Sequence, residues 1–491
     1  MATKKRKKGK VHTPLVDMLN HDIDSIIRWC TPSIHPKVPR INGIYQNDIS
    51  VSFHKIGNPS MDTGVFHEAH KLAAKAYRAD HTLFSVNGST GSNFMVLRAL
   101  KHQLGKVKML AQRNVHKSIS CAIEDFQIDI SYIKPHYDNT LQIFVPNSIE
   151  EILHNLKKDK AINVLFLSLP TYEGLSIDLK TLIKKVRSYN SNIIIFIDEA
   201  WGAHFPFSKK MPVCAMDAGA DICVQSTHKQ GSGLQQTSMI HWQGKRIKRK
   251  YILDSYQALM TTSPSFHLLA SIDAARYLME TQGKECIDDL IKLSDALREG
   301  LQKIPGVNVI SEDYIKNHHK QIKKIDRSKV LINIAETGIS GYELAHYLEE
   351  TYKVIVEKYE ANNILFLTTF QNSHFEAEQT VKYVQEAIQS LQKIKSYTKT
   401  VTFPQFPETI LKQKSSYAVS EARFTRADIN KSLGKICAEY VVPYPPGIPL
   451  LAKGEIIQKE HITYLNALKQ YKRLTYVLMS DKDINKILIT Q

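Results

Sequence analysis

A lysine directly follows serine, threonine and histidine in the segment DICVQSTHKQGSGLQQTSMIH, residues 221–241. The apolar residues near its start are typical of a strand, and the polar residues and glycines after them predict a loop with a tight turn. Lys229 is therefore expected at the junction between a strand and a loop. An isolated lysine at such a place is usually a solvated charge, so any chemistry at Lys229 depends on what the rest of the chain brings to it.

Small polar residues follow an earlier predicted strand. The segment LFSVNGSTGSNFMVLRAL, residues 83–100, predicts a strand, a loop and then a helix. Ser89 and Thr90 fall where this helix begins, and the free N–H groups and dipole of a helix N-terminus attract an anion such as phosphate. An ordinary helix capped by serine or threonine is the alternative.

Two further strands are followed by titratable residues. His116 comes after a short strand in LAQRNVHKSIS, residues 110–120, where a structural histidine is the alternative. Asp198 ends the apolar run in IFIDEAWGAH, residues 195–204. An unpaired carboxylate is costly in a buried strand, so a cationic partner is expected there, either a ligand or a salt bridge within the fold.

Strands alternate with helical patterns through the middle of the chain, as in LFLSLP (165–170), LKTLIKKVRSY (179–189) and NIIIFIDEA (192–200). Repeated βα units predict a three-layer α/β domain with a mostly parallel sheet. Ligands of such sheets bind beyond the carboxyl ends of the strands, so the segments above are expected to converge there. The predicted units are an N-terminal segment with a basic tail (1–60), a large ligand-binding domain (61–300), a smaller α+β domain (301–395) and a C-terminal domain (396–491).

Composition narrows the class of protein. The 491 residues are 43% hydrophobic, as in ordinary globular proteins. No apolar run is long enough to span a bilayer, and no apolar stretch follows the basic start to form a secretory signal. We therefore expect a cytoplasmic protein without membrane contacts. The six cysteines form no pair or cluster at metal-binding spacing, so no metal site is expected.

The formal net charge of +17 is concentrated in blocks at Lys4–Lys10, GKRIKRK (244–250) and KNHHKQIKKIDRSK (316–329). We interpret these blocks as a tail and two solvated loops. No recognition motif with interleaved aromatic residues accompanies them, so nucleic-acid binding is not expected. A non-catalytic protein that binds polyanions would explain the charge, but it would leave Lys229, Asp198 and His116 as coincidences.

One cofactor would use all of these features. Pyridoxal phosphate needs a lysine amine, a carboxylate at its ring nitrogen, an aromatic plate over the ring and a phosphate cup. The motifs NVHKS, DEAWGAH, STHK, TTSPS and YPPGIP, in this order, resemble the ornithine/lysine/arginine decarboxylases of the aspartate aminotransferase fold. The resemblance runs from about residue 50 to the end and implies the three-layer fold of pyridoxal-phosphate-dependent transferases.

The resemblance assigns roles around the cofactor ring. It implies that Lys229 binds the cofactor covalently, that Asp198 pairs with the ring nitrogen and that His116 stacks on the ring face. His228 would lie on the side where the substrate carboxylate leaves, and either Lys229 or His228 could then return a proton to Cα. Trp201 would shape the adjoining wall.

The resemblance also implies a phosphate site shared between two subunits. Ser89, Thr90 and Ser226 would hold the phosphate within one chain. Thr262 and Ser263, in TTSPS, would reach the phosphate of the neighbouring subunit, which implies a homodimer with shared active sites.

The expected reaction is decarboxylation of a basic amino acid, and arginine giving agmatine is favoured because the length resembles that of the compact arginine decarboxylases without the N-terminal wing domain. Lysine or ornithine decarboxylation, and an aminotransferase or oxidative reaction, remain alternatives. A cationic substrate needs a carboxylate in the pocket, for which the candidates are Glu173, Glu199, Asp62 and Glu455. The family has glycine where this chain has Ser33-Ile34, which puts the entrance of the site in question because these residues do not readily adopt a positive φ.

Overall fold

The computed structural model describes residues 27–40, 43, 48–51, 56–394, 403–408, 411–444, 447–471 and 474–491. The basic block Lys4–Lys10 lies outside these residues. Within the described ranges, no helix is both long and apolar enough to cross a membrane.

The large domain is built on a seven-stranded sheet of order β2-β11-β10-β9-β7-β3-β4. Its strands are β2 (His81–Ser85), β3 (Lys108–Gln112), β4 (Asp129–Ile133), β7 (Val164–Ser168), β9 (Ile194–Asp198), β10 (Ile222–Gln225) and β11 (Ser238–Trp242). β11 pairs antiparallel with both of its neighbours, and the other pairs are parallel. The predicted mostly parallel sheet is therefore confirmed.

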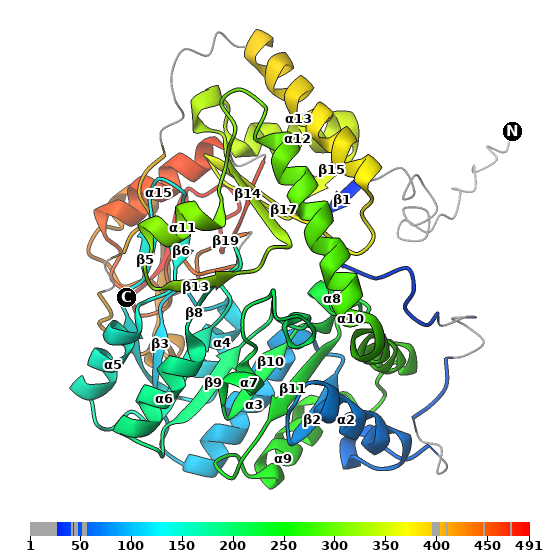
Figure 1. Cartoon of the computed structure of the whole chain (residues 1–491). Coiled ribbons are helices and arrows are strands. Elements are labelled where there is room, and N and C mark those ends of the chain that lie inside the picture. The colour runs from blue at the N-terminus through cyan, green and yellow to red at the C-terminus, as the bar shows by residue number, and fades with distance from the viewer. Residues whose placement is uncertain are drawn as a thin grey trace, which may run out of the picture.

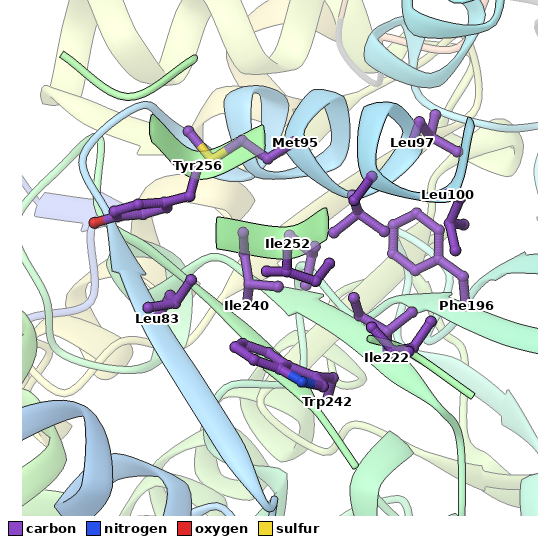
Figure 2. Close-up of a cluster of buried hydrophobic side chains, with 14 of the residues drawn as sticks. Leu83, Met95, Leu97, Leu100, Phe196, Ile222, Ile240, Trp242, Ile252 and Tyr256 are labelled. Carbon is purple, nitrogen blue, oxygen red and sulfur yellow. The ribbon is translucent and has the colours of Figure 1, made fainter. Parts of the chain in front are cut away.

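Helices cover both faces of this sheet (Figure 1). One face carries α3 (Gly88–Leu104), α4 (Lys117–Asp125) and α9 (Arg249–Leu259), and the other carries α5 (Ile149–Lys158), α6 (Leu179–Tyr189) and α7 (Ala215–Ala218). α2 (Gly64–Ala76) packs on this second face at the edge formed by β2, where the His70 ring contacts Phe84. Successive side chains of a strand point to opposite faces of the sheet. In β9, Phe196 therefore belongs to one core, and Ile195 and Ile197 belong to the other. Figure 2 shows the first core, where Met95 and Leu100 of α3 pack over the sheet.

A smaller α+β domain follows the long helix α10 (Phe266–Leu301). Its antiparallel sheet has the order β12-β14-β17-β16, with β12 (Asn308–Val309), β14 (Lys329–Asn333), β16 (Lys358–Tyr359) and β17 (Asn363–Leu367), and it is joined by α12 (Gly341–Tyr352) and α13 (His374–Ile394). The N-terminal strand β1 (Ile27–Trp29) pairs with β15 (Val354–Val356) of this domain. The buried Trp29 indole donates a hydrogen bond to Thr380 Oγ1 at 2.8 Å.

The basic stretch 316–329 corrects the predicted solvated loop. It contains the end of α11 (Glu312–His318) and the strand β13 (Ile322–Ile325), which pairs with β8 (Leu175–Ile177) of the large domain. Lys329 is only 4% exposed. The sequence of β13, Ile-Lys-Lys-Ile, has no strict alternation of apolar and polar residues that would have indicated a strand. In the other block, 244–250, Arg249 already begins α9.

The C-terminal domain contains α14 (Ser416–Ser420), α15 (Lys459–Gln470) and two small antiparallel sheets, β18 (Phe424–Asp428) with β21 (Lys486–Thr490) and β19 (Val442–Tyr444) with β20 (Tyr476–Leu478). Its core includes Tyr342 of α12, so it packs directly on the smaller domain. Figure 1 shows this domain, in orange and red, beside β5 (His136–Asp138) and β6 (Ile143–Val145).

Candidate active site

A cavity of about 390 Å³ lies beyond the carboxyl ends of the parallel strands. Among the residues predicted from the sequence, it is lined by Ser89, Thr90, His116, Asp198, Trp201, His228 and Lys229. These residues follow β2, β3, β9 and β10, so the topology brings together segments that are far apart in the sequence.

Lys229 lies in a short helix, α8 (Thr227–Gln230), and not in the predicted loop. The polar sequence contains no apolar period that would have indicated a helix. Its Nζ lies 4.0 Å from the centroid of the Trp201 ring. Burial lowers the pKa of Lys229 to about 8, and the charges of Asp198 and Glu357 oppose that shift.

Asp198 ends β9 and is 6% exposed. Its Oδ2 accepts a hydrogen bond from the Asn93 amide at 3.2 Å, whereas its Oδ1 has no hydrogen-bond partner among the described residues. Burial raises the pKa of Asp198, and the nearby charge of Lys229 opposes the rise. No salt bridge to Asp198 is formed within the described ranges. The Oδ1 lone pairs are therefore left for a group that enters the cavity.

His116 caps the N-terminus of α4. Its Nδ1 accepts the Ser118 backbone N–H at 3.2 Å, so a neutral ring carries its proton on Nε2. Burial lowers the pKa of His116 to about 4, and the positive charge of Lys229 contributes to the shift. At neutral pH the ring is uncharged and suited to contact with an aromatic face.

His228 has the opposite tautomer. Its Nδ1 lies 2.8 Å from the Thr237 carbonyl oxygen, to which it donates its proton. Burial lowers the pKa of His228 to about 4. Nε2 of the neutral ring therefore carries a lone pair and can accept a proton, but it has none to donate.

The N-terminus of α3 can hold an anion. Asn87 is its N-cap residue but makes no side-chain capping bond, because its amide donates to the Leu259 carbonyl at 2.9 Å. The predicted serine or threonine cap is therefore not formed, and the N–H groups of the first turn, at Ser89 and Thr90, remain for a ligand.

The other predicted phosphate residues do not line the cavity. Ser226 is fully buried, and its Oγ has no hydrogen-bond partner among the described residues. Thr262 and Ser263 are exposed in the segment before α10. A single chain does not bring these two residues to the other predicted site residues.

Glu357 and Lys329 of the smaller domain, and Tyr172 in the turn between β7 and β8, were not predicted from the sequence. Glu357 lines the cavity, where it accepts hydrogen bonds from Tyr172 Oη at 2.7 Å and from the Thr31 backbone N–H at 2.9 Å. Lys329 Nζ lies 3.4 Å from the centroid of the Trp201 ring and donates to the Tyr172 carbonyl. Burial lowers the pKa of Lys329 to about 8. No local pattern singles out Glu357 or Lys329, because each reaches the site only through packing between domains.

Only one of the four candidate substrate carboxylates lines the cavity. Glu173 lines the cavity and forms an ion pair with Lys358 at 2.7 Å. The others do not line the cavity and have other partners: Glu199 binds the Gln225 amide, Asp62 binds His70 and Arg249, and Glu455 binds Arg113.

The Ser33-Ile34 loop does not need glycine. Neither residue has a positive φ, which corrects the concern about backbone conformation. The Ser33 backbone N–H donates to the Lys229 carbonyl at 3.1 Å, and its Oγ accepts the Phe370 N–H at 2.9 Å. The serine thus links the helix of Lys229 to the smaller domain through a hydroxyl that glycine lacks.

Family models match both parts of the chain. The major domain of Orn/Lys/Arg decarboxylase matches residues 42–376, and the C-terminal domain of the same family matches residues 396–475. The chain belongs to the Orn/Lys/Arg decarboxylase family. This membership confirms the resemblance inferred from the motifs and the expectation of an amino-acid decarboxylase.

Individual relatives of the chain are also decarboxylases of basic amino acids by name. The arginine decarboxylase of Bacillus subtilis is 32% identical over 82% of this chain and 81% of its own length. The inducible lysine decarboxylase of Escherichia coli is 24% identical over 84% of this chain and 69% of its own length. The crystal structure of the Francisella novicida lysine decarboxylase superposes with a TM-score of 0.74 at 19% identity, over 91% of this chain and 75% of that one, which confirms the predicted fold class.

Competitive acetylation of the cofactor-free protein should report the lowered pKa of Lys229. The neutral, reactive amine should form as the pH rises through about 8, well below the 10.5 of an ordinary lysine. Asp198→Asn removes a negative charge that raises this pKa, so the midpoint should move to lower pH. Mass spectrometry of the peptide that contains Lys229 measures the labelling.

Glu199→Gln is the matched control, because Glu199 is a buried carboxylate that hydrogen bonds to Gln225 and to the Ala215 N–H and does not line the cavity. It should leave the midpoint unchanged. A wild-type midpoint near 10.5, or equal midpoints in wild type and Asp198→Asn, would contradict the electrostatic account.

Proposed function

We propose that this protein decarboxylates arginine to agmatine and CO2, using pyridoxal phosphate bound at Lys229. The observation that carries the proposal is the single cavity that contains the Lys229 amine, the unpartnered Oδ1 of Asp198 and the uncapped N-terminus of α3. Among the relatives, the arginine decarboxylase at 32% identity is more similar than the lysine decarboxylase at 24%. This difference favours arginine as the substrate.

The donor set of the cavity fits the proposed cofactor. The first-turn N–H groups of α3 suit its phosphate, and the neutral ring of His116 suits its aromatic face. Asp198 Oδ1 is a buried acceptor without a donor, which suits a protonated ring nitrogen. Lys229 supplies the amine for the covalent link.

When bound, pyridoxal phosphate supplies an electron-poor ring that accepts the electron pair left at Cα as CO2 departs. Asp198 would stabilise a proton on the ring nitrogen, and its burial would strengthen that interaction. Lys229 is better placed than His228 to return a proton to Cα, because His228 Nε2 carries none and its pKa is about 4. His228 and Trp201 line the cavity, where they would help to exclude water from a bound substrate.

Lys329 is the competing cofactor lysine, because it shares the Trp201 ring with Lys229 and also has a pKa lowered to about 8. The Lys329 ammonium, however, donates a hydrogen bond to the Tyr172 carbonyl oxygen. Lys329 also lines a neighbouring cavity rather than the one that contains Asp198. We therefore assign the cofactor to Lys229.

Glu357 is the proposed partner of the substrate guanidinium. Its two described hydrogen bonds leave further lone-pair sites on a carboxylate that lines the cavity. Glu173 also lines the cavity, but Lys358 neutralises it. A chain of net charge +17 needs such a local negative charge to bind a cationic substrate.

We also propose that two chains share their active sites, with Thr262 and Ser263 contacting the phosphate in the partner. Both are exposed, polar and outside the cavity of their own chain, as this role requires. Sedimentation as a monomer in the fully active, cofactor-loaded state would contradict this arrangement.

Purified protein with added pyridoxal phosphate should release CO2 and agmatine from arginine faster than it releases CO2 from lysine or ornithine. Lys229→Ala should remove both the release of CO2 and the visible absorbance of the lysine-bound cofactor. Preference for lysine or ornithine would overturn the substrate assignment. Conversion of arginine without CO2 would instead favour an aminotransferase or oxidative reaction.

Glu357→Gln should lower kcat/KM for arginine about 10- to 100-fold, because the amide oxygen still accepts a hydrogen bond but no longer carries the negative charge that strengthens the bond to the guanidinium. Inhibition by citrulline, which has the shape of arginine without its charge, should change by less than about threefold. Glu173→Gln is the comparison, since that carboxylate is already paired with Lys358. A larger loss in Glu173→Gln than in Glu357→Gln would assign the guanidinium to Glu173.

A further inference from the structure

A segment of the C-terminal domain, Gly447–Glu455, reaches the active site. Ile448 lines the cavity, as does Tyr444 just before the segment. The Gly447 carbonyl accepts the backbone N–H of Lys117 at 3.2 Å. Lys117 is the first residue of α4 and directly follows His116. The C-terminal domain therefore contributes a wall of the site and also a bond at the helix that carries His116.

Gly447 lies against the His116 ring. A Cβ at this position would lie 3.3 Å from His116 Cδ2 and 3.4 Å from His116 Nε2. The φ of Gly447 is +85°, which favours glycine over other residues. The backbone of the segment thus contacts the ring edge that is opposite the bond between Nδ1 and Ser118. The His116 ring is therefore positioned at two edges, by Ser118 at Nδ1 and by Gly447 at Cδ2 and Nε2.

The same loop that carries His116 also anchors this segment. Arg113, three residues before His116, is 5% exposed and binds Glu455 through two bonds of 2.8 Å, from Nε to Oε1 and from Nη2 to Oε2. Its Nη1 donates to the Pro449 carbonyl at 3.0 Å. Glu455 Oε2 also accepts the Ala452 N–H at 2.8 Å. One guanidinium therefore binds the segment at two points.

We propose that Arg113 and Glu455 are positioning residues: their ion pair fixes the segment Gly447–Glu455 against His116 and so sets the orientation of the ring for stacking on the cofactor. The stacking part rests on the proposed function, whereas the contact between the segment and the start of α4 is a property of the protein without cofactor. A buried ion pair adds little stability over apolar side chains of similar size. Its bidentate geometry instead fixes orientation.

Two variants and a control test this proposal. Glu455→Gln removes the charge, and Arg113→Lys keeps a positive charge but loses the bidentate geometry. Glu439→Gln is the control, because Glu439 is a buried glutamate of the same domain whose carboxylate binds Ser480 and the Leu488 N–H and makes no described bond to a side chain of the segment. Each protein is compared by hydrogen–deuterium exchange without cofactor and by its dissociation constant for pyridoxal phosphate.

Glu455→Gln and Arg113→Lys should speed amide exchange in the peptide that spans residues 114–120, because the bond from Lys117 to Gly447 is weakened. They should also raise the cofactor dissociation constant roughly tenfold. Glu439→Gln should change neither quantity. If Glu455→Gln does not fold, Arg113→Lys provides the same two readings.

The proposal is overturned if the variants exchange as the wild type does in this peptide. It is also overturned if Glu439→Gln changes both quantities equally, since the pair would then only stabilise the domain. Faster exchange with an unchanged cofactor dissociation constant would remove the stacking role. Failure of the wild type to bind pyridoxal phosphate would end the proposed function, while the exchange comparison would still test the contact.

Discussion

Parallel pairing of β9 with β10 is the constraint on which the site depends. The register places Val224 opposite Asp198, so both strands end at the same edge of the sheet. α8 begins after Ser226, and the Ser226 N–H donates to the Ala200 carbonyl at 3.3 Å. Lys229 is thereby held close to Asp198 by backbone geometry.

Burial changes the acidity of both Lys229 and Asp198. It lowers the pKa of Lys229 and raises the pKa of Asp198, and the opposite charge of each residue opposes the shift of the other. Neither residue forms a direct salt bridge within the described ranges, although both line the same cavity. An incoming cationic ring nitrogen would therefore meet a carboxylate that is already desolvated and has an unpartnered oxygen, which strengthens their attraction.

The sequence alone could predict the parts of the site that follow strands. Asp198, His116, Ser89 and Lys229 follow apolar runs whose length and flanking residues indicate strands, and parallel topology then requires that they meet. The alternation of strands and helices in the large domain was predictable for the same reason.

The remaining parts depend on packing over long separations in the sequence. Glu357 reaches the cavity, and Lys329 reaches the neighbouring cavity and the Trp201 ring, because β13 pairs with β8 and the smaller domain lies beyond the 36-residue helix α10. Glu455 was considered as a substrate carboxylate, but the structure pairs it with Arg113. A short helix such as α8 has no apolar period that would indicate it in the sequence. The proposed role of Thr262 would require a second chain.

Borohydride reduction of the cofactor-loaded protein, followed by peptide mapping, tests the central claim most directly. Reduction makes the bond between cofactor and lysine permanent, so mass spectrometry identifies the residue. Two buried lysines with pKa values near 8 contact the Trp201 ring. The account predicts the adduct on Lys229 alone. An adduct on Lys329, or no adduct in a protein that decarboxylates its substrate, would contradict it.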